Sequence, residues 1–312
     1  MKTKTHFQQQ VFLKPFLPFS FLFLICCFSS FRTNGQSYDS LVNLQGHQAQ
    51  VYYSKGALAK AKRMAAQTDA VMQFYQGLTG FTPAVVLLVL SPEDWSTYSQ
   101  TPVYGMPHYT DSKTLVVAAA NNDFWKSFIP PLEKLPAGLA TRISATYADP
   151  KGGLTMEPFF DLLAIHELGH AYHKQAGLQI QRKWMGELFV NIFLHTYIAE
   201  KEPRLLPALT LFPNMVVTVT DRHKLKYTSL QDLEQLYDEI TRQYPQNYGW
   251  YQCRWHMEAG SIYDAGALSV FNKLWEFLKE QQLVVDDNSL TDLLNRKVHA
   301  RVAAVIQQWD KE

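Results

Sequence analysis

The chain has 312 residues, of which 47% are hydrophobic and 18% are charged. This is the composition of a globular protein that buries a sizeable core, and it excludes a disordered chain. The first 36 residues hold four of the 29 basic residues and none of the 28 acidic ones, so the remainder carries a net charge near −3. That balance argues against nucleic acid as a partner.

The first 36 residues have the pattern of a signal peptide. Lys2, Lys4 and Lys14 precede an apolar stretch at 16–28, and small and polar residues follow it. We expect cleavage near Gly35–Ser37, which would place the mature chain in the periplasm or outside the cell. The apolar stretch is shorter than the roughly 20 residues of a membrane span, so no span is expected after cleavage. An uncleaved N-terminal anchor is the alternative.

The cysteines limit how the exported chain is stabilised. Cys26 and Cys27 lie in the apolar stretch and suggest a lipoprotein, but Leu24 and Ile25 are bulky where a lipidation signal has small residues. Lipidation is therefore the weaker interpretation. Cleavage would leave Cys253 alone, without a partner for an internal disulfide. Stability must then come from core packing, to which a metal could add.

Strands and helices alternate in the first half of the chain, and helices dominate the second. Hydrophobic patterns and turn residues predict strands at 49–54, 83–90 and 113–123, a helix at 56–80 and a short helix from Pro92. Further helices are predicted at 160–176, 180–200, 230–243, 249–281 and 289–310. This order indicates an α+β fold with a mixed sheet and a helical C-terminal half. We expect one domain over 37–312, with a sheet-containing half at 37–176 and a helical half at 177–312.

The segment "HELGH" places His166, Glu167 and His170 in one turn of an apolar helix. Histidines four positions apart share a helix face and can bind one ion, and the adjacent glutamate can act as a general base. A buried helix whose histidines find ordinary hydrogen-bond partners is the alternative. Unpaired polar groups in so apolar a segment would each cost a few kcal/mol, which favours a metal. The pattern therefore predicts a catalytic zinc site.

A catalytic zinc site needs a third protein ligand, and the sequence offers His173 or Glu187. His173 lies a further turn along the same helix, so that helix would have to curl around the ion to use all three histidines. Glu187 lies in a second apolar helix, reached after a turn at Gly177, and a charge in such a helix needs a partner. Glu187 is the better candidate.

With Glu187 the pattern resembles the gluzincins, the thermolysin-like and aminopeptidase N-like zinc peptidases of the peptidase MA-like superfamily. Their third ligand is a glutamate that follows the second histidine at a spacing close to the 17 positions between His170 and Glu187. "WMGE" at 184–187 resembles the approach to that glutamate in aminopeptidases. Metzincins differ, because they have glycine where this chain has His173 and histidine where it has Ala176.

The resemblance implies a zincin-like fold, with an edge strand of the sheet over the "HELGH" helix, and one Zn²⁺ per chain. His166, His170 and Glu187 would be its ligands, Glu167 would be the general base, and a peptide or protein would be the substrate. Asn191, one turn after Glu187, takes the place of an aspartate that orients a zinc histidine in thermolysin-like enzymes; an ordinary helix asparagine is the alternative.

The resemblance also implies groups that contact the substrate. Tyr251 is the first choice for stabilising the oxyanion, and Tyr248 and His256 are competitors. The strand at 115–121 resembles the edge strand that pairs with substrate in these families, so Val117, Ala118 and Ala119 would align the peptide.

Two departures weaken an exopeptidase assignment. Glu157 in "GGLTMEP" resembles the glutamate that binds the substrate amino group in aminopeptidases, but it lies only nine positions before His166. An acid in the first turn of the helix is the simpler interpretation. In addition, Leu188 replaces the glycine that follows the third ligand.

Two other functions fit the same pattern. The chain could be a periplasmic or surface binding protein that retains the scaffold with little or no turnover, or a zinc hydrolase of a non-peptide amide. Retention of Glu167 argues against a binding-only protein, which has least need of that residue.

Overall fold

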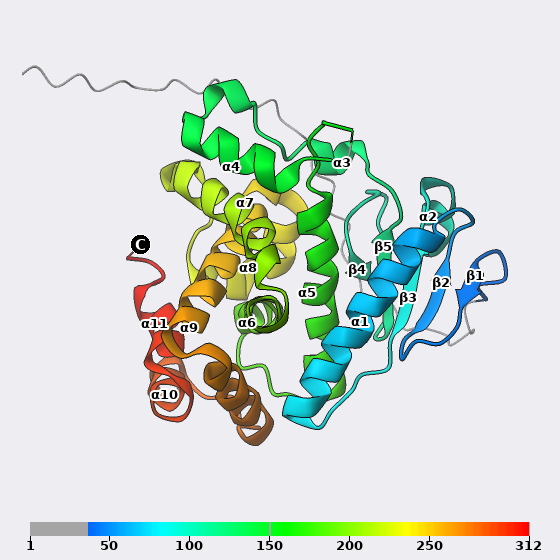
Figure 1. Cartoon of the computed structure of the whole chain (residues 1–312). Helices are drawn as coiled ribbons and strands as arrows, with labels where there is room; N and C mark the ends of the chain where they lie inside the picture. Colours follow the sequence, from blue (N-terminus) through cyan, green and yellow to red (C-terminus); the bar gives the residue numbers. More distant parts are fainter. Residues whose placement is uncertain (1–36, 150, 312) are drawn as a thin grey trace, which may run out of the picture.

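A five-stranded mixed sheet forms the N-terminal part of the fold. The computed structural model describes residues 37–149 and 151–311 (Figure 1). The strands are β1 (Val42–Leu44), β2 (Gln50–Tyr53), β3 (Val86–Leu90), β4 (His108–Tyr109) and β5 (Thr114–Ala118), in the spatial order β1-β2-β3-β5-β4. β2, β3 and β5 are parallel, whereas β1 and β4 pair antiparallel at the two edges.

The centre of the sheet is buried on both faces. Every residue of β3 and β5 is buried, with Leu88 opposite Val116 in the register. Their continuous apolar sequences are typical of strands covered on both sides. Helix α1 (Leu58–Thr79) packs on β2 and β3, and α5 (Glu157–Gln175) packs on β4 and β5 and against α1. The "HELGH" helix is thus held against the edge of the sheet (Figure 1).

The chain is mostly helical after α5. The main helices are α6 (Lys183–Lys201), α7 (Leu206–Val219), α8 (Leu230–Gln243), α9 (Pro245–Glu280), α10 (Asp287–Leu293) and α11 (Ala300–Gln308). Helix α6 is buried on all sides from Trp184 to Ile198 and packs on both α5 and α9. A helix that is apolar all round belongs in the interior, and α6 is the inner helix of this half.

Shorter elements connect these helices. In the first half they are α2 (Pro92–Tyr98), α3 (Asp123–Lys126), α4 (Ala137–Tyr147) and a 3₁₀ turn at Leu132–Lys134. Later in the chain, 3₁₀ turns occupy Pro203–Leu205 and Arg222–Lys224, and a π-helical turn at Leu294–Val298 separates α10 from α11.

The structure confirms the α+β class and the order of the predicted elements. The predicted helix at 289–310 is two helices, because the π-helical turn interrupts it. The sequence analysis missed β1 and β4, which are only three and two residues long, and also missed α3 and α4. It also missed α7, whose Pro213 lies inside the helix, where proline normally removes a hydrogen bond.

The predicted signal peptide lies outside the described residues. Within 37–149 and 151–311, no helix combines the length and the apolarity that crossing a bilayer requires.

The structure corrects one expectation about the sheet. The strand predicted at 113–123 is β5, which lies inside the sheet, and the edge strand on this side is β4. Val117 and Ala118 are buried and pair with β3, and the Ala119 amide donates to the Leu90 carbonyl. An extended substrate that adds to the sheet on this side would therefore meet β4.

Helix α9 contains a strained residue. Ala267 has φ 48° and ψ −147°, and the backbone departs there from helical geometry. An L-residue with a Cβ rarely adopts this conformation, and it costs on the order of 1–3 kcal/mol. The Ala267 side chain is exposed, so its methyl group offsets little of that cost by burial.

We expect Ala267→Gly to raise the free energy of unfolding by about 1 kcal/mol, because glycine relieves the strain. Urea denaturation monitored by circular dichroism measures the change. Ala265→Gly is the matched control, because Ala265 is also exposed but lies in regular helix. It should lower stability by about 1 kcal/mol. If both variants were destabilised alike, Ala267 would not be strained.

Candidate metal centre

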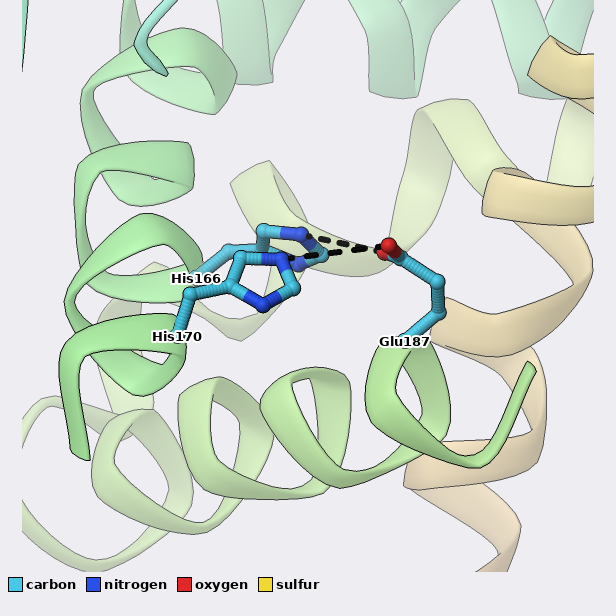
Figure 2. Close-up of side chains that lie close together, drawn as sticks. All are labelled: His166, His170 and Glu187. Carbon is cyan, nitrogen blue, oxygen red and sulfur yellow. Dashed lines mark ion pairs between the residues drawn. The ribbon is translucent and has the colours of Figure 1, made fainter. Parts of the chain in front are cut away.

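His166 and His170 of α5 point toward Glu187 of α6 (Figure 2). His166 Nε2 lies 3.5 Å from Glu187 Oε2, and His170 Nε2 lies 3.9 Å from Glu187 Oε1. One ligand atom from each of the three residues lies within 4.8 Å of the other two. Two imidazoles and one carboxylate form a donor set used in catalytic zinc sites. The three residues predicted from the sequence as ligands are therefore brought together and could bind a metal.

A close contact between α5 and α6 creates this arrangement. A Cβ built on Gly169 would lie 3.1 Å from Val190 Cβ and 3.3 Å from Phe193 Cδ1, so a larger residue would push α6 away. After α5 ends, Gly177 has φ +68°, and the Leu178 amide donates to the His173 carbonyl at 3.1 Å. This left-handed turn reverses the chain and sends α6 back across α5.

The start of α6 is fixed by Arg182. Its guanidinium donates to the Val285 carbonyl at 2.6 Å and to the Asp287 carboxylate at 2.7 Å, both beyond the end of α9. The Lys183 amide donates to Glu234 of α8 at 2.7 Å. These contacts hold the helix end that carries Glu187.

Two side chains from α8 and α9 hold the Glu187 carboxylate. The Tyr237 hydroxyl donates to Oε1 at 2.9 Å, and the Gln252 amide donates to Oε2 at 3.0 Å. Burial alone would raise the pKa of Glu187, but the hydrogen bond with His166 and the charges of both histidines lower it well below its ordinary value. Glu187 is therefore an anion held ready for a cation.

Asn191 lies where it can orient His166. Its Nδ2 donates to the Glu187 carbonyl at 2.9 Å, which leaves its Oδ1 as an acceptor. Asn191 Oδ1 and His166 Nδ1 are both buried and lack a partner with full hydrogen-bond geometry among the described residues. Burial lowers the pKa of His166, but Glu187, with smaller contributions from Glu167 and Asn191, raises it above the ordinary value. The orienting role expected for Asn191 stays a prediction.

His173 has a contact that the sequence analysis did not anticipate. Its Nε2 lies 3.0 Å from His170 Nδ1, and its ring packs edge-on against Phe189. Burial lowers the pKa of His173 to about 4, so the ring is neutral near pH 7. Burial also lowers the pKa of His170 well below its ordinary value. His173 is therefore a neighbour of a candidate ligand.

Glu167 lies half-buried beside the three candidate ligands. Its pKa is raised to about 7: burial raises it most, the charge of His166 lowers it, and the charge of Glu187 raises it. The charge of Glu167 contributes to raising the pKa of Tyr109 of β4 and that of Tyr248 of α9. The side chain predicted as the general base thus lies within electrostatic range of both the sheet edge and α9.

The structure places Tyr251 away from this centre. Its hydroxyl donates to the Ser229 carbonyl at 2.7 Å, and its ring stacks on Trp309. The placement expected of it opposite the metal is therefore corrected. Of the two tyrosines considered on α9, Tyr248 is the one near the centre: its hydroxyl lies 3.4 Å from that of Tyr237, which donates to Glu187.

A polar stripe on α9 faces the centre. Tyr248, Gln252 and His256 are each four positions apart, and residues at this spacing share one helix face. The His256 ring centroid lies 6.4 Å from that of His166. The sequence analysis missed Gln252, although the four-residue spacing of polar residues in an apolar helix was visible there.

Glu157 takes part in an ion-pair cluster where α5 begins. Lys60 of α1 is buried and binds Glu157 at 2.9 Å and also Asp161, and Arg63 binds the same two carboxylates at 3.2 and 3.5 Å. Glu157 therefore acts as an acid in the first turn of the helix, neutralised by α1. These ion pairs anchor the N-terminal end of α5.

The centre fits a divalent metal, on three features of the described residues. The imidazole nitrogens of both histidines converge on the buried Glu187 carboxylate, and the two other side chains that contact this carboxylate are uncharged donors. The third feature is that His166 Nδ1 is buried without a hydrogen-bond partner among the residues described. No known family model, curated protein or solved structure matches this chain.

We expect Lys60→Met to lower the free energy of unfolding by about 2–3 kcal/mol, because it leaves the carboxylates of Glu157 and Asp161 with Arg63 alone. Adding Asp161→Asn should restore part of that loss. Lys62→Met is the control, because Lys62 is exposed on the same helix and should change stability by less than about 0.5 kcal/mol. Equal effects of the two lysine variants in thermal unfolding would contradict a structural role for the cluster.

Proposed function

We propose that the chain is an exported metal-dependent hydrolase that cleaves peptide bonds, with zinc as its metal. The observation that carries the proposal is the convergence of His166, His170 and Glu187 beside Glu167, a carboxylate on the same turn of α5 as the histidines. Gluzincins combine the same residue types in the same chain order.

The residues divide into ligands and a base. His166, His170 and Glu187 would hold one zinc ion, which when bound supplies Lewis acidity and lowers the pKa of water. Glu167 would accept a proton from the attacking water and pass it to the leaving amine. Burial raises the pKa of Glu167 to about 7, and a base of that strength can both take and return a proton near neutral pH.

Other residues position the ligands and the substrate. Tyr237 and Gln252 orient the Glu187 carboxylate, and Asn191 orients His166. Tyr248, which interacts electrostatically with both Glu187 and Glu167, is the best placed residue to donate to a developing oxyanion; it replaces Tyr251 in that role.

The edge of the sheet supports a peptide as the substrate. Edge strand β4 lies against α5, and an extended chain can add to such an edge by backbone hydrogen bonds. Glu157, the counterpart of an amino-group anchor, is already paired with Lys60 and Arg63. That pairing favours cleavage within a chain over removal of its first residue.

If these residues form a zinc site, purified protein should hold about one zinc per chain. Inductively coupled plasma mass spectrometry measures this after the protein is loaded with zinc and dialysed to remove unbound zinc. His166→Ala should lose most of that zinc, because two ligands seldom retain it through dialysis. His223→Ala is the matched control, since His223 is exposed in a 3₁₀ turn. Full zinc occupancy in His166→Ala would contradict the proposed metal site.

Because Glu167 is the proposed general base, we expect Glu167→Gln to retain zinc but to cleave peptides about 10²–10⁴-fold more slowly. A proteome-derived peptide library, read by mass spectrometry, measures cleavage without assuming a sequence preference. Glu276→Gln, an exposed substitution on α9, should cleave like the wild type. Zinc-loaded wild type that cleaves no peptide would instead favour a binding protein or a non-peptide amide substrate.

A further inference from the structure

His173 was set aside as a ligand in the sequence analysis, yet it contacts one of the candidate ligands. His173 Nε2 lies 3.0 Å from His170 Nδ1, and the two ring centroids are 5.2 Å apart at an interplanar angle of 69°. The residues are three positions apart on α5, where side chains are neighbours on the helix surface. The contact is therefore set by the helix itself.

The packing around His173 limits where its ring can lie. The side chain is buried, with 9% of the residue exposed. Its ring meets Phe189 of α6 edge-on, at 5.9 Å between centroids and 86° between planes. Phe189 lies two positions after Glu187, so the contact between α5 and α6 that forms the metal centre also holds His173.

The two ring nitrogens of His170 have separate tasks. Nε2 faces Glu187 Oε1 at 3.9 Å, and in the proposed site it would present its lone pair to the metal. A neutral imidazole then carries its proton on Nδ1, which becomes a donor. The acceptor within reach of that proton is His173 Nε2.

A parallel arrangement supports the assignment. His166 also turns Nε2 toward Glu187, and Asn191 interacts with the same ring and raises its pKa. Histidines that bind metals generally donate their other ring nitrogen to a partner that fixes ring orientation and tautomer. Each candidate histidine ligand thus has a polar neighbour, besides Glu187, that can take this role.

We propose that His173 is a positioning residue, which accepts a hydrogen bond from His170 Nδ1 and so keeps His170 Nε2 directed at the bound metal. The inference rests on the proposed metal site. It assigns no ligand role to His173, and it explains why a histidine is buried at this position.

The first test observes the hydrogen bond directly. In protein labelled with ¹⁵N-histidine, with and without zinc, we expect a scalar coupling across the hydrogen bond between His170 Nδ1 and His173 Nε2. The coupling should vanish in His173→Gln, which has no ring nitrogen. Absence of the coupling in wild-type protein that binds zinc would overturn the inference.

The second test measures zinc affinity by competition with a chelator. His173→Phe keeps the aromatic contact with Phe189 but removes the acceptor, and it should weaken zinc binding by about 10–100-fold. His173→Gln returns an acceptor oxygen and should bind within about threefold of wild type. His47→Phe is the control; it breaks the 2.7 Å contact of His47 with Asp69, away from the centre, and should leave affinity unchanged.

The outcomes separate this inference from the proposed function. Equal zinc affinity in wild type, His173→Phe and His173→Gln would show that His173 does not position His170. Loss of affinity in both variants would indicate a direct ligand role or a packing role and would also overturn the inference. If wild type shows the coupling but binds no zinc, the proposed function fails while the hydrogen bond stands.

Discussion

The close approach of α5 and α6 is the constraint on which the metal centre depends. Gly169 lies inside the "HELGH" turn, and its missing side chain lets Val190 and Phe193 come into contact with the backbone of α5. This contact brings Glu187, one turn before Val190, level with His166 and His170. The glycine of the motif therefore has a packing role beside the chemical roles of its neighbours.

A buried carboxylate is costly unless it is paired, and Glu187 has four partners for its two oxygens. Tyr237 and Gln252 donate hydrogen bonds, and the Nε2 atoms of the two histidines lie 3.5 and 3.9 Å from the carboxylate oxygens. These partners come from α5, α8 and α9. Because residues of three other helices contact this carboxylate, it is difficult to explain as a surface charge. It is well suited to bind a cation between the helices.

The local chemistry could be predicted from the sequence, but most of the long-range contacts could not. The spacing of His166 and His170 fixes their common face in any helix, and Glu187 stood out as a charge in an apolar segment. The partners from α8 and α9 depend on how those helices are rotated against α6. Tyr248 and Tyr251 are three positions apart, so a modest rotation decides which one faces the centre. Tyr251, the first choice from the sequence, instead donates to the Ser229 carbonyl.

The same reasoning explains the outcome for the sheet. Continuous apolar runs predicted the buried central strands of the sheet, because runs of this kind are distinctive in a sequence. Edge strand β4 has only two residues and carries no pattern of its own. It is a strand only because it pairs with β5. Which strand forms this edge of the sheet could therefore not be predicted from the sequence.

The distribution of the site across the chain couples metal binding to folding. The two histidines come from α5, which the ion pairs of Lys60 anchor to α1 and the sheet. The carboxylate comes from α6, and the groups that orient it come from α8 and α9, far along the chain. No single segment holds the complete centre, so a metal that binds it must stabilise the packing of the helical half on the sheet-containing half, because binding to the folded state alone adds its free energy to that state.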